Sequence, residues 1–263
     1  LYETEDTFDT TGKTPIQTVT NGLGNDAGAF QFKLNYEKAG KYYYVIEEVV
    51  PSGVDSNNKL NGITFDTTKY HVTVEVKDQG TGELSTTVTG LDSNNLASFT
   101  NKYDVQSVDA TIKGSKHIDG ALLDALYQGT EFYKFFEFEL YNAEVVQGEW
   151  TSQGSLVKTT KIKEVKADGT GYFEFTENYT KPGDYYYVVT EKFMNDDPFI
   201  VYDPTTYHIR VNVVDNLDGK LKSSVSYAMV GNSSSYDEVV FRNIVHPEEI
   251  VLTDIGGTKQ LTG

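Results

Sequence analysis

The sequence predicts an all-β protein made of two tandem β-sandwiches. Its 263 residues include 19 Tyr, 14 Phe and 23 Gly, a composition that favours strands joined by turns. Apolar and polar residues alternate in short runs, which is the pattern of strands with one buried and one solvated face. The chain also repeats itself, because residues 40–48 (GKYYYVIEE) return 143 positions later as residues 183–191 (GDYYYVVTE). A repeat of this length predicts two domains, each able to bury its own core.

The expected strands follow the same order in both copies. Residues 70–76 illustrate the alternation, since Tyr and three Val share one face while His71, Thr73 and Glu75 share the other. The equivalent strand at 207–213 lies 137 positions later, so the loop at 51–62 is longer than its counterpart by 143 − 137, or six residues. The predicted strands cover residues 29–34, 41–49, 70–76 and 84–88 in the first copy, and 135–141, 172–175, 185–191, 207–213 and 221–227 in the second.

Charge and cysteine content exclude several classes of function. With 22 Lys and Arg against 39 Asp and Glu, the net charge is −17, which disfavours nucleic acid and anionic membrane surfaces as partners. No apolar run approaches the roughly 20 residues that span a bilayer, and the N-terminus has no basic-then-apolar leader. The absence of cysteine excludes disulfides, thiolate metal sites and a cysteine nucleophile. We expect no cofactor and no metal, and any secretion signal or anchor to lie outside this chain.

Three polar residues recur at matching places in apolar strands: a lysine, a glutamate and an asparagine. In the second copy they are Lys116, Glu191 and Asn243. Lys113 is a competitor of Lys116, but residues three apart face opposite sides of a regular strand. The 143-residue register aligns Lys116 with Lys259 and Lys113 with a glycine, so Lys116 is expected to be the inward lysine.

Such a set can form a covalent bond. Burial in a low-dielectric core lowers the pKa of a lysine and raises that of a glutamate, so both approach neutrality. A neutral amine is a nucleophile, and a neutral carboxylic acid can polarise an amide and pass a proton to its leaving nitrogen. The predicted product is an isopeptide bond between Lys116 and Asn243, formed with loss of ammonia under catalysis by Glu191. This is a single turnover within the protein, and a turnover enzyme is not expected.

Four motifs, in order along the chain, resemble one known family. They are Lys-x-Ile/Leu-x-Gly at 116–120, Tyr-Tyr-Tyr-x-Val-x-Glu at 185–191, Tyr-Asp-x-Thr-x-Tyr at 202–207 and Phe-x-Asn at 241–243. The pattern resembles the streptococcal-type pilin isopeptide-linkage domain, found in sortase-assembled pilins and cell-wall adhesins of Gram-positive bacteria. The resemblance covers nearly the whole chain.

The resemblance implies a fold, a site and a role. The fold would be two tandem immunoglobulin-like (CnaB/pilin-type) sandwiches, the first lacking its N-terminal strand. The site would be an autocatalytic Lys116–Asn243 bond with Glu191 as catalyst, and Glu48 with Asn101 in the incomplete first copy. The role would be that of a secreted, cell-wall-anchored stalk or shaft segment of a fimbrium or adhesin, active in cell adhesion at the bacterial surface. Its partners would be neighbouring repeats or other copies of the chain, and a host surface ligand is a further candidate.

Two departures from the family favour a stalk of tandem repeats over a polymerising shaft pilin. Shaft subunits offer sortase an exposed lysine on a late strand, but residues 86–100 and 223–241 contain no lysine. The sorting signal is also missing, because the last four residues, QLTG, lack its proline.

The register of the repeats divides the chain into three parts. We expect an incomplete sandwich at 1–106, a complete one at 107–247 and the start of a further repeat at 248–263. Residues 1–3 resemble 140–142, so the first copy lacks a Lys-bearing segment, whereas 257–263 repeat that segment. Lys259 of one molecule could therefore react with Asn101 of another under Glu48 and link chains end to end. Alternatively, the ends are only fragment boundaries and Lys259 stays unreacted.

Other features have plainer interpretations. The Tyr runs at 42–44 and 185–187 could stack sugars, but aromatic residues in strands more often pack in the core. His71 and His208 stand alone on a solvated face and are interpreted as surface histidines, not metal ligands. Residues 215–219 hint at calcium, although a β-turn suffices. A competing function is a host-ligand or carbohydrate-binding adhesin head, in which loops such as 51–62 bind.

Overall fold

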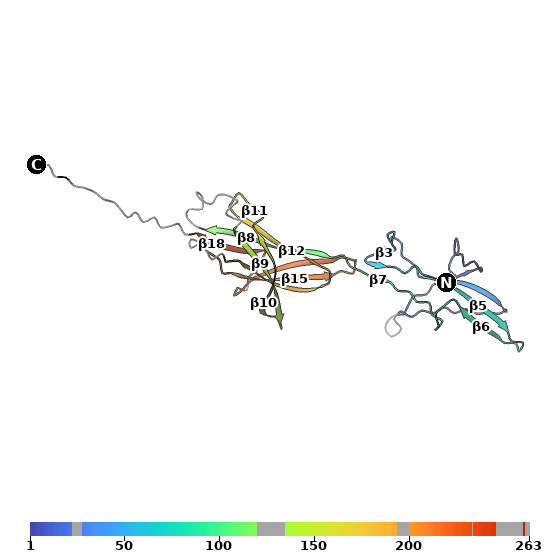
Figure 1. The fold of residues 1–263 in the computed structure, drawn as a ribbon. Coiled ribbons are helices and arrows are strands. Elements are labelled where there is room, and N and C mark those ends of the chain that lie inside the picture. The colour runs from blue at the N-terminus through green and yellow to red at the C-terminus, as the bar shows by residue number, and fades with distance from the viewer. Residues whose placement is uncertain (23–27, 120–134, 194–199, 233, 246–259, 261–263) are drawn as a thin grey trace. The chain divides into compact units, whose positions relative to one another are not determined.

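The computed structural model describes residues 1–22, 28–119, 135–193, 200–232, 234–245 and 260, and every regular element in these residues is a β-strand (Figure 1). The all-β prediction is therefore confirmed. Two compact units divide the chain. The first covers Leu1–Asp104 with Leu217–Gly219, and the second covers Val105–Asn216 and continues from Lys220.

The second unit is a two-sheet sandwich, as expected of an immunoglobulin-like domain. One sheet has the order β10-β9-β13-β15-β16-β17 and the other the order β11-β12-β8-β18-β14. The strands are β8 (Val108–Asp119), β9 (Glu137–Val146), β10 (Glu149–Lys161), β11 (Glu164–Val165), β12 (Gly171–Tyr179), β13 (Gly183–Glu191), β14 (Ile200–Val201), β15 (Thr206–Asp215), β16 (Leu221–Met229), β17 (Ser235–Tyr236) and β18 (Val239–Val245).

Strand β8 is the central strand of its sheet, and it determines where the site forms. It pairs antiparallel with β12 and parallel with β18, so that Lys116 lies opposite Phe241. Residues Phe241 and Asn243 share one face of β18, and both are buried. The side chains of Lys116 and Asn243 therefore enter the space between the two sheets from adjacent strands.

Aromatic rings fill the core between the sheets. The rings of Phe138 and Phe173 stack with their centroids 3.6 Å apart, and Phe241 stacks 5.6 Å from Phe138. Gly114 in β8 makes room for this stack, because a Cβ atom there would lie 2.1 Å from the Phe173 ring. Close packing of this kind leaves little space for water beside Lys116, which is fully buried.

Among its described residues, the first unit forms the counterpart of the six-stranded sheet and, of the other sheet, only the β14–β18 pairing. Its main sheet has the order β1-β2-β5-β6, and a small sheet has the order β3-β4-β7. Strand β1 pairs with β2 at Tyr2 and Val45, as β9 pairs with β13 at Tyr141 and Val188. The strands are β1 (Tyr2–Thr4), β2 (Gly40–Glu47), β3 (Lys59–Leu60), β4 (Ile63–Thr64), β5 (Lys69–Asp78), β6 (Leu84–Thr89) and β7 (Lys102–Tyr103).

The strand predicted at residues 29–34 is wrong. These residues carry no strand, although the equivalent segment of the second unit is β12. In the second unit β12 and β18 both pair with β8, and the described residues of the first unit contain no counterpart of β8. Without that central partner, a strand has no ladder to join. Phe30, Phe32 and Leu34 still pack against the core of the first unit.

Candidate functional site

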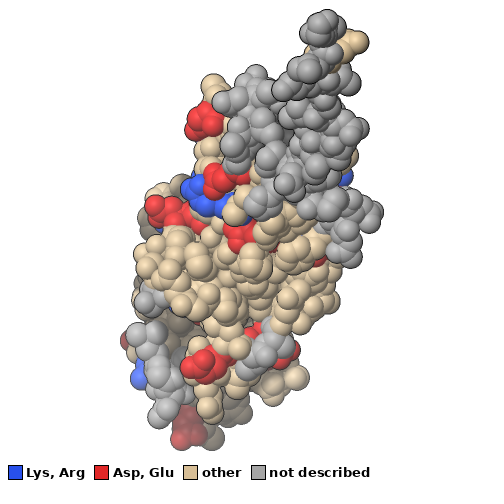
Figure 2. Space-filling model, turned by 90° about the vertical axis from the view of Figure 1, so that its left-hand side faces the viewer, with Lys and Arg blue, Asp and Glu red and all other residues tan. Residues whose placement is uncertain are grey.

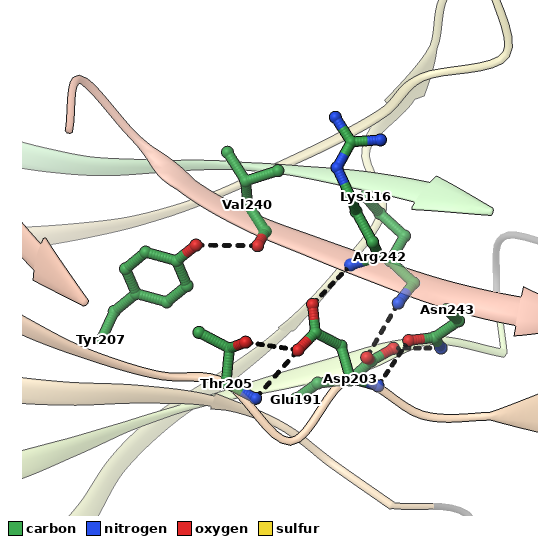
Figure 3. Close-up of polar contacts among 8 residues, drawn as sticks. All are labelled: Lys116, Glu191, Asp203, Thr205, Tyr207, Val240, Arg242 and Asn243. Carbon is green, nitrogen blue, oxygen red and sulfur yellow. Dashed lines mark hydrogen bonds and ion pairs between the residues drawn. The ribbon is translucent and has the colours of Figure 1, made fainter. Parts of the chain in front are cut away.

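The structure brings Lys116, Glu191 and Asn243 together in the core of the second unit (Figure 3). Lys116 and Asn243 come from β8 and β18 of one sheet, and Glu191 comes from the end of β13 in the other sheet. Lys116 Nζ donates to Glu191 Oε2 at 2.8 Å, and Asn243 Nδ2 donates to Glu191 Oε1 at 2.9 Å. One carboxylate therefore holds the amine and the amide on its two oxygens.

All three side chains are shielded from solvent. The exposed fractions of Lys116 and Asn243 are 0%, and that of Glu191 is 2%. Lys113, the competing lysine of the same strand, is exposed. Lys116 Nζ also lies 5.0 Å from the centroid of the Phe136 ring, a contact that favours a cation but cannot replace its hydration shell.

Burial moves both titratable groups toward neutrality. Desolvation lowers the pKa of Lys116 to about 8, although the nearby Glu191 carboxylate opposes this shift. Desolvation also raises the pKa of Glu191, against the opposing effects of Lys116 and Asn243. The free energy difference between the ion pair and the neutral pair is therefore much smaller here than in water.

The arrangement can carry a Lys–Asn condensation. A proton passes from the Lys116 ammonium to Glu191, and the free amine attacks Cγ of Asn243. The carboxyl proton then moves to Asn243 Nδ2, which leaves as ammonia, and Glu191 recovers one proton from the nitrogen of the new amide. Because the fold holds both reactants on one carboxylate, the reaction needs no diffusional encounter.

The first unit contains the glutamate and the asparagine of an equivalent set. Asn101 Nδ2 donates to Glu48 Oε1 at 2.6 Å, as Asn243 does to Glu191. Glu48 Oε2 is buried and has no hydrogen-bond partner among the described residues. Its neighbour Glu47 instead forms an exposed ion pair with Lys69 at 2.7 Å. Lys259 lies outside the described residues.

Asp203 is a site residue that the sequence does not single out. Its backbone N–H donates to Asn243 Oδ1 at 2.9 Å, so it contacts the amide that would react. The available signal was the motif at 202–207, which recurs at 65–70 as Phe-Asp-x-Thr-x-Tyr.

His71 is exposed, as its interpretation as a surface residue requires, and His208 is half-buried; each imidazole also has an aromatic ring stacked on it. The Phe8 ring stacks on His71 with the centroids 4.5 Å apart, and the Trp150 ring stacks on His208 at 4.0 Å. Both stacked rings come from segments outside the predicted strands, so the sequence pattern did not indicate these contacts. Burial accordingly lowers the pKa of His208.

The Tyr run at 185–187 packs mainly inward. Tyr187 is buried, and the hydroxyl of Tyr179 donates to that of Tyr187 at 3.0 Å. Among the described residues, no three His, Cys, Asp or Glu side chains gather closely enough to hold a metal ion. On the face drawn in Figure 2, acidic side chains are scattered among uncharged ones, and Lys and Arg form only small spots. The described segments also include no helix long and apolar enough to cross a bilayer.

A family model matches both units of the chain. The model is that of FctA, described as a Spy0128-like isopeptide containing domain, and it matches residues 2–104 and 112–246. The chain belongs to the FctA family. The expected resemblance to pilin isopeptide domains is thereby confirmed, and each unit corresponds to one FctA domain.

Solved structures similar to this FctA chain are streptococcal major pilins. The major pilin of Streptococcus pyogenes matches with 21% identity and a TM-score of 0.35, covering 54% of this chain and 51% of that one. A single-residue mutant of that pilin matches with 24% identity and a TM-score of 0.40, covering 52% and 50%. The chain thus spans about half the length of these pilins. Among curated proteins, none matches.

Proposed function

We propose that this FctA chain is a structural segment of a Gram-positive surface pilin or adhesin, stabilised by an autocatalytic bond between Lys116 and Asn243. The observation that supports it is the buried contact of both side chains with Glu191, at 2.8 and 2.9 Å. Burying an amine and a carboxylate costs stability, because the loss of hydration can exceed the attraction between the paired charges. Conversion to a neutral amide removes that cost permanently.

The bond would suit a protein under tension. Strands β8 and β18 are parallel neighbours near the start and the end of the matched range 112–246. Pulling the two ends of this domain apart would shear β8 against β18. A covalent link between them would carry the force and leave the rest of the sandwich unloaded. We accordingly propose that the chain acts at the cell surface as stalk or shaft material, with neighbouring repeats or other copies as its partners.

Intact mass tests the proposed bond. The purified chain should weigh one ammonia molecule less than its sequence for the bond in the second unit. Glu191→Gln keeps the shape of the side chain but cannot carry the proton, so it should restore the full mass. Lys116→Ala should do the same, and a wild-type chain of full mass would contradict the proposal.

We propose that the first unit accepts a Lys-bearing strand in place of β8. A groove of about 1460 Å³ runs through this unit and is lined by Phe30, Phe32, Val72, Glu48 and Asn101, among others. It pairs an apolar floor with the unpartnered Oε2 of Glu48, the atom equivalent to the one that binds Lys116 in the second unit. The occupant we propose is residues 248–263 of a second copy, because Lys259 occupies the repeat position of Lys116.

A peptide of residues 250–263 tests this strand addition. It is added to a full chain carrying Lys259→Met, so that the chain cannot supply its own lysine. The expected product is a covalent adduct lighter by one ammonia than the sum of the two masses, and Asn101→Ala should abolish it. Wild-type chains should likewise give a ladder on a denaturing gel. A peptide that binds without reacting, or fails to bind, would contradict the covalent link.

The proposed domain division follows from the same repeats. It assigns residues 1–106 to an incomplete sandwich, 107–247 to a complete one and 248–263 to a further repeat. The competing role, a host-ligand or carbohydrate-binding head, would use loops such as 51–62. Binding on a glycan array, unchanged by Glu191→Gln, would favour that role over a structural one.

A further inference from the structure

The turn that follows β14 is fastened to the strand that carries Asn243. Asp203 Oδ1 accepts hydrogen bonds from the backbone N–H of Thr205, at 2.9 Å, and from the Thr205 hydroxyl. Asp203 Oδ2 accepts the backbone N–H of Arg242 at 2.7 Å. The side chain of Asp203 therefore joins its own turn to β18 immediately before Asn243 (Figure 3).

The same turn aims a backbone donor at the amide of Asn243. The N–H of Asp203 donates to Asn243 Oδ1 at 2.9 Å, while Asn243 Nδ2 donates to Glu191. The two ends of the amide are thus held by different groups. This fixes which atom faces the proton donor and which atom is the oxygen that becomes negative during attack.

The first unit repeats this arrangement contact for contact. The N–H of Asp66 donates to Asn101 Oδ1 at 2.8 Å. Asp66 Oδ2 accepts the N–H of Thr100 at 2.9 Å, and Asp66 Oδ1 accepts the N–H of Thr68 at 2.9 Å. No lysine contacts Glu48 among the described residues of this unit, so the turn does not need the lysine to form. It prepares the amide before the amine arrives.

The tyrosine of the motif fastens the strand at a second point. The hydroxyl of Tyr207 donates to the carbonyl of Val240 at 2.9 Å, and that of Tyr70 donates to the carbonyl of Ser98 at 2.7 Å. Each contact lies three residues before the asparagine. The equal spacing in the two copies of the motif thus corresponds to two attachments on the segment that carries the asparagine.

We propose that the backbone N–H of Asp203 is the oxyanion donor of the crosslinking reaction, and that the Asp203 carboxylate and Thr205 are positioning residues that hold it. This inference rests on the proposed Lys116–Asn243 bond. When the Lys116 amine attacks Cγ, the C=O electron pair moves onto Oδ1, where the N–H of Asp203 stabilises the charge. The pair returns to re-form C=O as the C–Nδ2 bond breaks and ammonia leaves with the proton from Glu191.

The rate of ammonia loss separates positioning from simple stabilisation. The full chain is made by cell-free translation, and samples are denatured at intervals and weighed. Asp203→Ala keeps the backbone donor but releases the turn, and a misplacement of about 1 Å can cost about 100-fold in rate. We expect a slowing of roughly 10- to 100-fold for Asp203→Ala, and a smaller slowing for Thr205→Val, which loses only the hydroxyl donor.

The matched control is Asp168→Ala. Asp168 Oδ1 accepts the N–H of Thr170 at 3.0 Å in the hairpin before β12, so it forms a similar Asp-x-Thr turn that makes no contact with Asn243. Its rate should equal that of the wild type. The stability of both Asp variants is compared in a Lys116→Met background, in which no crosslink can form. With Lys116 in place, a folded Asp203→Ala chain should lose ammonia more slowly than Asp168→Ala, even if the two substitutions lower the free energy of unfolding equally.

Three outcomes would decide the matter. Wild-type rates in both Asp203→Ala and Thr205→Val, with ammonia lost from the wild type, would overturn this inference alone. A full mass in the wild type would overturn the proposed bond, and the inference with it. If Asp203→Ala does not fold, the Thr205→Val rate decides, since removing a half-buried hydroxyl leaves the turn backbone in place.

Discussion

Replacement of Lys116 by methionine should remove the crosslink while keeping the core filled. Methionine has nearly the volume of lysine and no charge, so it suits a fully buried position beside the Phe136 ring. The loss of Lys116 also removes the group that holds down the pKa of Glu191. The carboxyl should therefore stay neutral, and the cost of an unpaired buried charge should be small.

The expected loss of stability follows from the loop that the bond closes. Residues 116 and 243 are 243 − 116, or 127, positions apart, and the chain-entropy model gives about 5 kcal/mol for a loop of this length. The matched domain at 112–246 has an unfolding entropy of about 0.28 kcal/mol per kelvin at typical values per residue. The Tm of this unit should therefore fall by about 15 to 20 °C.

Calorimetry of the full chain measures this change, with Lys113→Met as the matched control. Lys113 is exposed on the opposite face of the same strand, and its loss should cost less than about 0.5 kcal/mol, or about 2 °C. Intact masses are recorded for each sample. A Lys116→Met chain that melts within a few degrees of a crosslinked wild type would refute the loop-closure reasoning.

Three further predictions concern the site and its surroundings. The rate of ammonia loss, measured by mass after transfer to buffers of different pH, should have a bell-shaped pH profile. Below the raised pKa of Glu191, both Glu191 and Lys116 are protonated, so no free amine is present. Above about pH 8, Lys116 and Glu191 together lack the proton that the leaving nitrogen needs. A rate still rising well above pH 8 would exclude the carboxyl as acid. Gly114→Ala should destabilise the second unit by about 1 to 3 kcal/mol in urea unfolding, because its Cβ would lie 2.1 Å from a stacked phenyl ring; unchanged unfolding would contradict the packing. Trp150→Ala should raise the pKa of His208 in an NMR titration, since the stacked indole helps to bury the imidazole, and a pKa that stays low would assign its burial to other neighbours.

The sequence by itself determined the fold class, the repeat and the three candidate residues of the second unit. Alternation along a strand is local, so parity placed Lys113 and Lys116 on opposite faces, and the 143-residue register selected Lys116. The repeat then selected the same positions twice, without any knowledge of distance. These features depend on residue type and spacing, which are written directly in the chain.

Only the tertiary structure decided what depends on partners distant in sequence. Residues 29–34 have the alternation of a strand, but a strand also needs a neighbour. Their counterpart β12 pairs with β8, and the described residues of the first unit contain no equivalent of β8. The stacking of Trp150 on His208 and the backbone donor of Asp203 at Asn243 likewise join residues about 40 or more positions apart. Such backbone hydrogen bonds and ring contacts leave no pattern of residue type and spacing in the sequence, so only the folded chain shows them.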